Sequence, residues 1–235
     1  VPEGPPLFTA ISRFCSRDVL TLLVEKGADP AARREGDRRS AYQVALRHGH
    51  AEAAAYLEEI GAATEADPFE RFAGACGRGD LATARQVLAE SPGLLAQLAA
   101  EDTAAFLRLA GKGPAKALAA MLDCGVPASL CGVQKETALH WAAWHGRRDA
   151  VEVLLAHGAA VAAVEQSFGA TPLGWAVHGS GNWPNPEGDY PGVVRLLLAA
   201  GADPESASVL PEGDDPAIVS LLREARGRHR EFGRE

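Results

Sequence analysis

The feature of this sequence that most constrains its fold is an internal repeat with a period of about 33 residues. Stretches beginning at Ser40, Thr137 and Thr171 share one plan: a hydroxyl residue, a helix-like segment of small residues, a turn, and a second apolar segment ending in glycine and alanine. Successive terminal glycines are separated by 34, 64, 33 and 43 residues, and 64 corresponds to two periods. The chain is therefore an array of similar units, whose terminal glycines are Gly27, Gly61, Gly125, Gly158 and Gly201.

The residue types of each unit fit two helices joined by a turn. A Ser or Thr before the first helix can accept a bond from an unpaired backbone amide, and Pro172 costs no hydrogen bond at the first helical position. Ala142 and Ala143 keep the first helix thin, and Leu154 fills the layer shared with the next unit. Gly158 is expected to end the second helix in the left-handed conformation. Since no unit buries its apolar face alone, stability is a sum over neighbouring units.

These units resemble the ankyrin repeat. The motif Thr137-Ala138-Leu139-His140 differs from the family's T-P-L-H signature at one position, and Thr171-Pro172-Leu173-Gly174 differs at another. The resemblance covers nearly the whole chain. It implies an all-α ankyrin-repeat solenoid of about six helix-turn-helix repeats and a C-terminal capping helix. The phrases ALHWAAWHG and FGATPLGWAVHGS look most like a bacterial group of ankyrin-repeat proteins whose activity is not settled.

We expect one ankyrin-repeat domain over residues 1–235. The third repeat carries a G-D variant of the turn, and the fourth departs furthest from the family pattern. The C-terminal cap is expected at 205–235. The six repeats are placed at about 5–35, 36–66, 67–98, 99–131, 132–164 and 165–204.

The sixth repeat contains an insertion of about nine residues, near 180–192. Pro172 and Gly201 are 29 residues apart, whereas the equivalent Ala138 and Gly158 are 20 apart. The Pro, Gly and Asn content of the insertion predicts a loop, which adds little closure entropy there. Its two aromatic residues predict that the loop docks, either on its own repeat or as one wall of a ligand site.

Charge and cysteine usage exclude several function classes. The chain has 23 Lys and Arg against 31 Asp and Glu, a net charge of −8, which disfavours binding to nucleic acid or to a membrane surface. No apolar run approaches the roughly 18 residues of a membrane span. The four cysteines lack C-x-x-C spacing and clustered histidines, so we expect no metal site and reduced thiols. These features predict a cytoplasmic monomer without a cofactor.

The resemblance to ankyrin repeats places partner contacts in a concave groove, formed by the first helix of each repeat and the turn after it. The variable positions there are basic in the second to fourth repeats and Trp- and His-rich in the fifth and sixth. All four tryptophans lie within 43 residues. The expected binding residues are Arg47, His48, Arg78, Arg108, Lys112, Trp141, Trp144, His145, Trp175, His178, Trp183 and Tyr190.

Two function classes fit this surface. The first is an interaction module that holds a partner protein or peptide in the groove, since aromatic and Arg anchors are typical of interface hot spots. The second is a small-molecule site for an anionic or aromatic ligand, with His145 and His178 as acid–base groups of a catalytic version. Since no nucleophile elbow, phosphate loop or H-E-x-x-H motif is present, we expect the interaction module.

Some residues of this region have plain structural alternatives. Each helical tryptophan could be packed in an apolar seam instead of facing a partner. His140 is the signature histidine and is expected to bond to backbone at the turn. Glu165, just before Phe168 and Gly169, is expected to cap the turn rather than reach the pocket.

Overall fold

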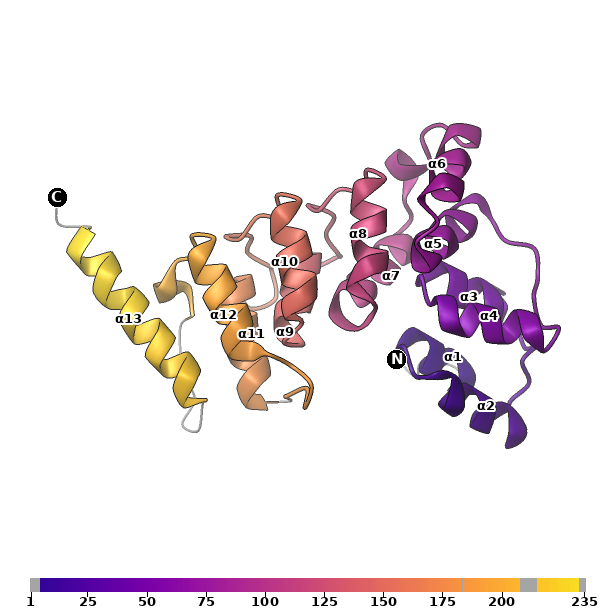
Figure 1. The fold of residues 1–235 in the computed structure, drawn as a ribbon, viewed down its shortest axis with the longest axis horizontal. Helices are drawn as coiled ribbons and strands as arrows, with labels where there is room; N and C mark the ends of the chain where they lie inside the picture. Colours follow the sequence, from indigo (N-terminus) through magenta and orange to yellow (C-terminus); the bar gives the residue numbers. More distant parts are fainter. Residues whose placement is uncertain (1–4, 183, 208–214, 233–235) are drawn as a thin grey trace. The chain divides into compact units, whose positions relative to one another are not determined.

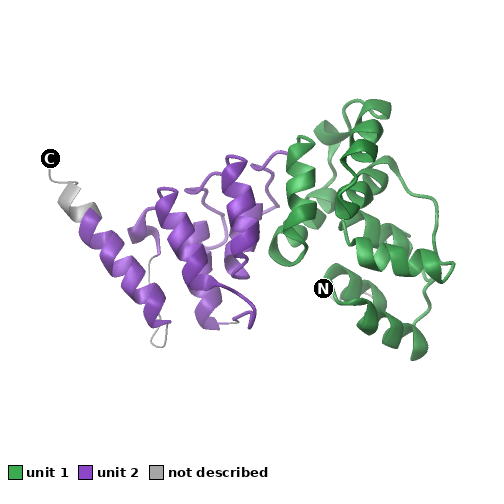
Figure 2. Ribbon diagram, viewed as in Figure 1, with its two compact units in different colours: residues 1–126 green, residues 127–235 purple. Residues whose placement is uncertain are grey.

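The computed structural model of this chain consists of helical hairpins that follow one another along the sequence (Figure 1). It describes residues 5–182, 184–207 and 215–232. The chain divides into two compact units, unit 1 (residues 1–126) and unit 2 (residues 127–235), which Figure 2 colours separately. Each unit is described by itself below, and the expectation of one domain over the whole chain stays a prediction.

In unit 1 the first helices of the first three hairpins pack on one another. Within it, helix α3 packs against α1 on one side and α5 on the other, and α5 also packs against α8. A short 3-10 turn, η1 (Leu94–Gln97), follows the third hairpin. The helices of unit 1 are α1 (Pro6–Ser12), α2 (Arg17–Glu25), α3 (Ala41–Arg47), α4 (Ala51–Glu59), α5 (Pro68–Arg78), α6 (Leu81–Glu90), α7 (Ala100–Lys112) and α8 (Ala115–Asp123).

Unit 2 repeats the same arrangement. Its first helices α9 and α11 pack against each other, and its second helices α10 and α12 do the same. The last helix, α13, covers α12 as the predicted cap should. The helices of unit 2 are α9 (Ala138–Trp144), α10 (Arg148–Ala156), α11 (Pro172–Asn182), α12 (Tyr190–Ala199) and α13 (Pro216–Phe232), with a 3-10 turn η2 (Pro204–Ser206).

Local chemistry starts and ends these helices as the sequence predicts. The Ser40 hydroxyl accepts the Gln43 amide at 3.2 Å, and the Gln43 side chain accepts the Ser40 amide at 2.9 Å, which makes a capping box. All five terminal glycines have positive φ, for example +76° at Gly158. A residue with a side chain is strained at such a φ, whereas glycine adopts it at little cost in energy and so can end the second helix.

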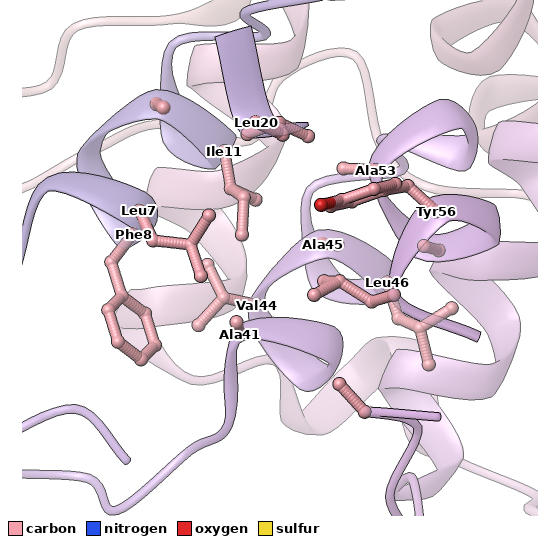
Figure 3. Packing of buried hydrophobic residues seen from close by; sticks show 14 residues of the cluster. Leu7, Phe8, Ile11, Leu20, Ala41, Val44, Ala45, Leu46, Ala53 and Tyr56 are labelled. Carbon is pink, nitrogen blue, oxygen red and sulfur yellow. The ribbon is translucent and has the colours of Figure 1, made fainter. Parts of the chain in front are cut away.

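The cores are layers between hairpins. In unit 1, Leu7 and Ile11 of α1 pack toward Val44 of α3, with Tyr56 of α4 closing the same cluster (Figure 3). In unit 2, Leu154 is fully buried, as predicted. Small buried residues such as Ala142 let adjacent first helices approach closely.

The insertion of the sixth repeat is only partly a loop, which corrects the prediction for 180–192. Helix α11 has 11 residues where α9 has seven, so about one added turn continues the helix. Ser180 donates its hydroxyl to the Val177 carbonyl at 2.7 Å, and the Asn182 side chain donates to the His178 carbonyl at 3.0 Å. Such local bonds satisfy carbonyls at the end of the helix.

Candidate functional site

A pocket of about 670 Å³ opens on the first helices of unit 2. We call it the Trp pocket. Helices α9 and α11 form its floor, and the turns before α11 and after η2 close two of its sides. Its lining residues are Trp141, Trp144, Phe168, Ala170, Gly174, Trp175, Val177, His178, Ser206 and Ala207.

Three tryptophans form one aromatic cluster in this pocket. The Trp175 ring lies at the centre, with centroid distances of 6.1 Å to Trp141 and 5.6 Å to Trp144. The interplanar angles are 63° and 70°, so the rings meet edge to face. Each tryptophan is partly exposed, and the cluster is therefore both packed and accessible.

A buried carboxylate shapes the turn that carries Phe168. Glu165 accepts backbone amides from Ser167, Phe168 and Ala170, with the last two at 2.9 and 3.1 Å. Burial raises the pKa of the Glu165 carboxyl, but these amides lower it more, so its pKa lies below the usual value. The expectation that Glu165 caps the turn is confirmed. The turn leaves the Phe168 side chain 87% exposed beside the pocket.

The signature histidine ties this turn to α9. His140 is fully buried, and its Nδ1 accepts the Thr137 amide at 3.1 Å. Its Nε2 then carries the proton and donates to the Ala170 carbonyl at 3.2 Å. Burial lowers the pKa of His140, so the ring stays neutral in this role. The predicted backbone bond of His140 is confirmed, and it gives the pocket a rigid wall.

His178 stands at the edge of the pocket. Its exposed ring lies over Trp144, with centroids 5.4 Å apart and an angle of 39°. The Asn182 side-chain amide lies 3.2 Å from its Nδ1. Because that amide nitrogen is a donor, Nδ1 accepts, and a neutral ring then carries its proton on Nε2. His178 therefore offers an N–H at the pocket.

The structure does not bring the two candidate acid–base histidines into one site. His145 follows the last residue of α9, packs edge to face against Trp141 at 6.0 Å, and does not line the Trp pocket. Ser180 uses its hydroxyl on the Val177 carbonyl. In the described parts of unit 2, no carboxylate hydrogen bond to His178 is seen that would orient it for catalysis.

The inserted loop docks on the turn of the preceding hairpin. The Tyr190 hydroxyl donates to the Trp144 carbonyl at 3.1 Å and accepts the Asn185 amide at 3.0 Å. A Cβ on Gly146 would lie 2.8 Å from the Gly188 Cα, so the close approach depends on glycine. Of the loop residues that are described, none lines the Trp pocket. The described part of the loop therefore docks on the preceding hairpin and not on the Trp pocket, and Tyr190, predicted to bind a partner, is a buried structural residue.

The predicted loop residue Trp183 lies outside the described residues. Its place in the groove therefore stays a prediction.

Arg47, predicted to face the groove, is instead a core residue of unit 1. Its guanidinium is 4% exposed and pairs with Asp67 at 2.6 Å, Glu70 at 3.4 Å, and Asp102. Arg39 joins the same group through Glu70 at 3.0 Å. We call these five residues the Arg47 cluster. Two arginines and three carboxylates pair with one another in this cluster, so Arg47 is not available to a partner.

Two further residues of the predicted basic groove are also buried or half-buried. His48 is buried, its Nδ1 contacts the Val44 carbonyl at 2.8 Å, and burial lowers its pKa to about 4. Arg108 is half-buried and lies 3.5 Å from the His48 ring nitrogen. Arg78 and Lys112 are the exposed members of the predicted set. The basic groove was wrong for Arg47 and His48, since both side chains are used within the unit.

The described ranges also bear on metal sites and membrane spans. They contain no group of three or more His, Cys, Asp or Glu side chains arranged to hold a metal ion. None of the helices there combines the length and the apolar character that crossing a bilayer requires.

Comparisons with known proteins identify the repeat. Residues 106–208 match a family model described as ankyrin repeats in three copies. A stretch of 68 residues is 46% identical to the palmitoyltransferase Hip14 of Drosophila melanogaster, covering 29% of this chain and 9% of that protein. The crystal structure of the human ASB11 ankyrin repeat domain matches with a TM-score of 0.52 and 22% identity, over 92% of this chain and 97% of that one. The predicted all-α ankyrin-repeat fold is confirmed.

Proposed function

Because residues 106–208 match a model of ankyrin repeats, we propose that this chain binds a partner protein or peptide, with the Trp pocket of its fifth and sixth repeats as the anchor site. Ankyrin repeats are in general protein-interaction modules. The observation that carries the proposal is the half-exposed cluster of Trp141, Trp144 and Trp175 beside the 87% exposed Phe168. Large exposed apolar groups gathered in one place mark interaction sites.

The geometry of the pocket suits an interface anchor. Its volume of about 670 Å³ falls within the usual range for ligand pockets. The bonds of His140 and Glu165 hold its walls, so little ordering is needed when a partner binds. Tryptophan is also among the residues most enriched at interface hot spots.

The catalytic alternative has less support. His178 reaches the pocket, whereas His145 packs against Trp141 outside its lining. A general base is normally positioned by a hydrogen-bonding partner. Among the described side chains, the partner seen at His178 is the Asn182 amide and not a carboxylate. Binding without turnover is the function that these contacts favour.

We also propose that residues 1–235 form one domain of a bacterial, cytoplasmic protein. The continuity of the repeat supports the single domain. The Trp-rich phrases of the last two repeats support the bacterial group, and the four free cysteines, which lack C-x-x-C spacing, support the location.

Site-directed photo-crosslinking tests the partner-binding proposal. A benzophenone amino acid replaces Phe168, and the matched control carries it at Leu22, a 52% exposed residue of α2. We expect a crosslinked protein from position 168 alone, and we expect Trp175→Ala, introduced beside the label, to reduce its yield at least fivefold. Equal capture from both positions, or a yield unchanged by Trp175→Ala, would contradict the proposal.

A further inference from the structure

We infer that the Trp pocket selects an uncharged aromatic or large aliphatic side chain with a carbonyl group beside it, and that it discriminates against a cationic anchor. This inference rests on the proposed function and names the chemistry of the partner's anchor. It follows from which hydrogen-bonding groups of the pocket are already used and which remain.

Several acceptors around the pocket are already engaged. The Ala170 carbonyl accepts from His140, and the Trp144 carbonyl accepts from Tyr190. Both carboxylate oxygens of Glu165, in the turn before α11, accept hydrogen bonds from backbone amides. Of the lining residues that the structure describes, none is Asp or Glu. A cation entering the pocket would lose hydration without gaining a counter-charge.

Donors, in contrast, remain. The Nε2–H of His178 lies at the pocket edge, since Nδ1 is occupied by Asn182. The Trp141 Nε1–H is buried and has no acceptor among the described residues. An occupant that supplies a carbonyl oxygen can accept from the His178 Nε2–H, whereas an ammonium group can only add another donor.

The aromatic rings are also arranged against a cation. A cation binds over the open face of a ring, within about 6 Å of its centroid. Here Trp141, Trp144 and His140 each pack at a steep angle against Trp175, and the His178 ring lies 5.4 Å from Trp144. These neighbours cover part of the ring surface that a cation would use. An uncharged ring or branched aliphatic group can pack against the outer surface of the cluster and against Phe168.

A matched pair of small probes tests this selectivity. N-acetylphenethylamine is neutral and carries a carbonyl, while phenethylammonium has the same ring and chain with a positive charge. Each is titrated into the full-length ¹⁵N-labelled protein, and binding is followed by the indole N–H signals of the four tryptophans. We expect the neutral probe to bind at least fivefold more tightly, with the pocket indoles shifting. Equal or tighter binding of phenethylammonium, or of tetramethylammonium, would overturn the inference.

Histidine variants locate the donor. His178→Ala should bring the affinity ratio of the two probes closer to one by at least twofold. The matched control, His157→Ala, removes another exposed histidine of unit 2 that does not line the pocket, and it should leave the ratio unchanged. A ratio unaffected by His178→Ala contradicts the assigned donor.

If the probes fail this test while crosslinking at position 168 still depends on Trp175, the inference falls and the proposed function stands. If the probes behave as expected but crosslinking does not depend on Trp175, the proposed function falls.

Discussion

One repeat position is buried and charged in unit 1 but exposed and aromatic in unit 2. Arg47 stands seven residues after the cap residue of its hairpin, and Trp144 and His178 occupy the same position in the last two hairpins. Arg47 is enclosed by carboxylates, whereas Trp144 is half-exposed and His178 is exposed. The repeat position alone therefore does not determine whether its side chain is buried or exposed. What the neighbouring first helices carry decides whether its side chain becomes core or binding surface.

The physical reason is compensation of charge. An arginine can be buried only where anions meet it, and α5 and α7 supply Glu70 and Asp102. In unit 2 the following helix supplies Trp175 and His178, which give ring contacts and no negative charge. The same backbone therefore produces a buried ion cluster in one unit and an accessible aromatic pocket in the other.

The largest expected effect comes from breaking the Arg47 cluster. Arg47→Ala leaves Asp102 and Glu70 buried with less compensation, and we expect it to lower the free energy of unfolding by about 3–5 kcal/mol in urea denaturation. The control is Arg71→Ala, which removes an exposed pair with Glu90 and should cost no more than about 1 kcal/mol. Equal costs for the two variants would show that the cluster is not a core element.

In unit 2 we expect the comparable loss of stability from a change in the buried leucine layer. Leu154 is fully buried, and Leu154→Ala should lower the free energy of unfolding by about 2–4 kcal/mol through the cavity it leaves. Leu22→Ala, at an exposed position of α2, should change it by roughly 0.5 kcal/mol or less. A urea midpoint for Leu154→Ala that matches that control would place Leu154 outside the core.

The buried His48 makes stability depend on pH. Burial lowers its pKa from the usual 6.5 to about 4, so the unfolded chain binds this proton first as the pH falls. Its contribution is present above about pH 6.5 and is lost toward pH 4, by about 2–3 kcal/mol.

The checking measurement compares the parent with His48→Gln in urea titrations at pH 7.5 and pH 4.5. The parent should lose more stability over this interval than the variant does, because other groups titrate equally in both. Parallel losses would mean that the His48 proton is not excluded by folding.

The smallest expected loss of stability comes from placing the arginine of unit 1 at the equivalent aromatic position of unit 2. Trp144→Arg loses ring contacts with Trp175 and His178 and finds no carboxylate cluster, so we expect a cost of about 1–2 kcal/mol. Trp144→Phe keeps a ring and should retain most of that stability in the same urea assay. A cost above about 4 kcal/mol for Trp144→Arg would show that the position is core in unit 2 as well.

Much of the site was predictable because its signals are local. The roles of His140 and Glu165 depend on residues within a few positions, namely Thr137 and the turn amides from Ser167 to Ala170. The tryptophans at α9 and α11 share a repeat position, so their meeting follows from the period alone. The docking of the loop was not predictable, since the Tyr190 hydroxyl bonds to a carbonyl 46 residues away.

The sequence by itself determined the helical hairpins, their repeat and their left-handed ends, because caps, small residues and glycines act over a single turn of backbone. Only the tertiary structure decided which groove residues remain accessible. Arg47 was removed from the surface by Asp67, 20 residues further on, and by Asp102, which belongs to a different hairpin. Burial of a charged group depends on the anions that surround it in space, and no local pattern in the chain records them.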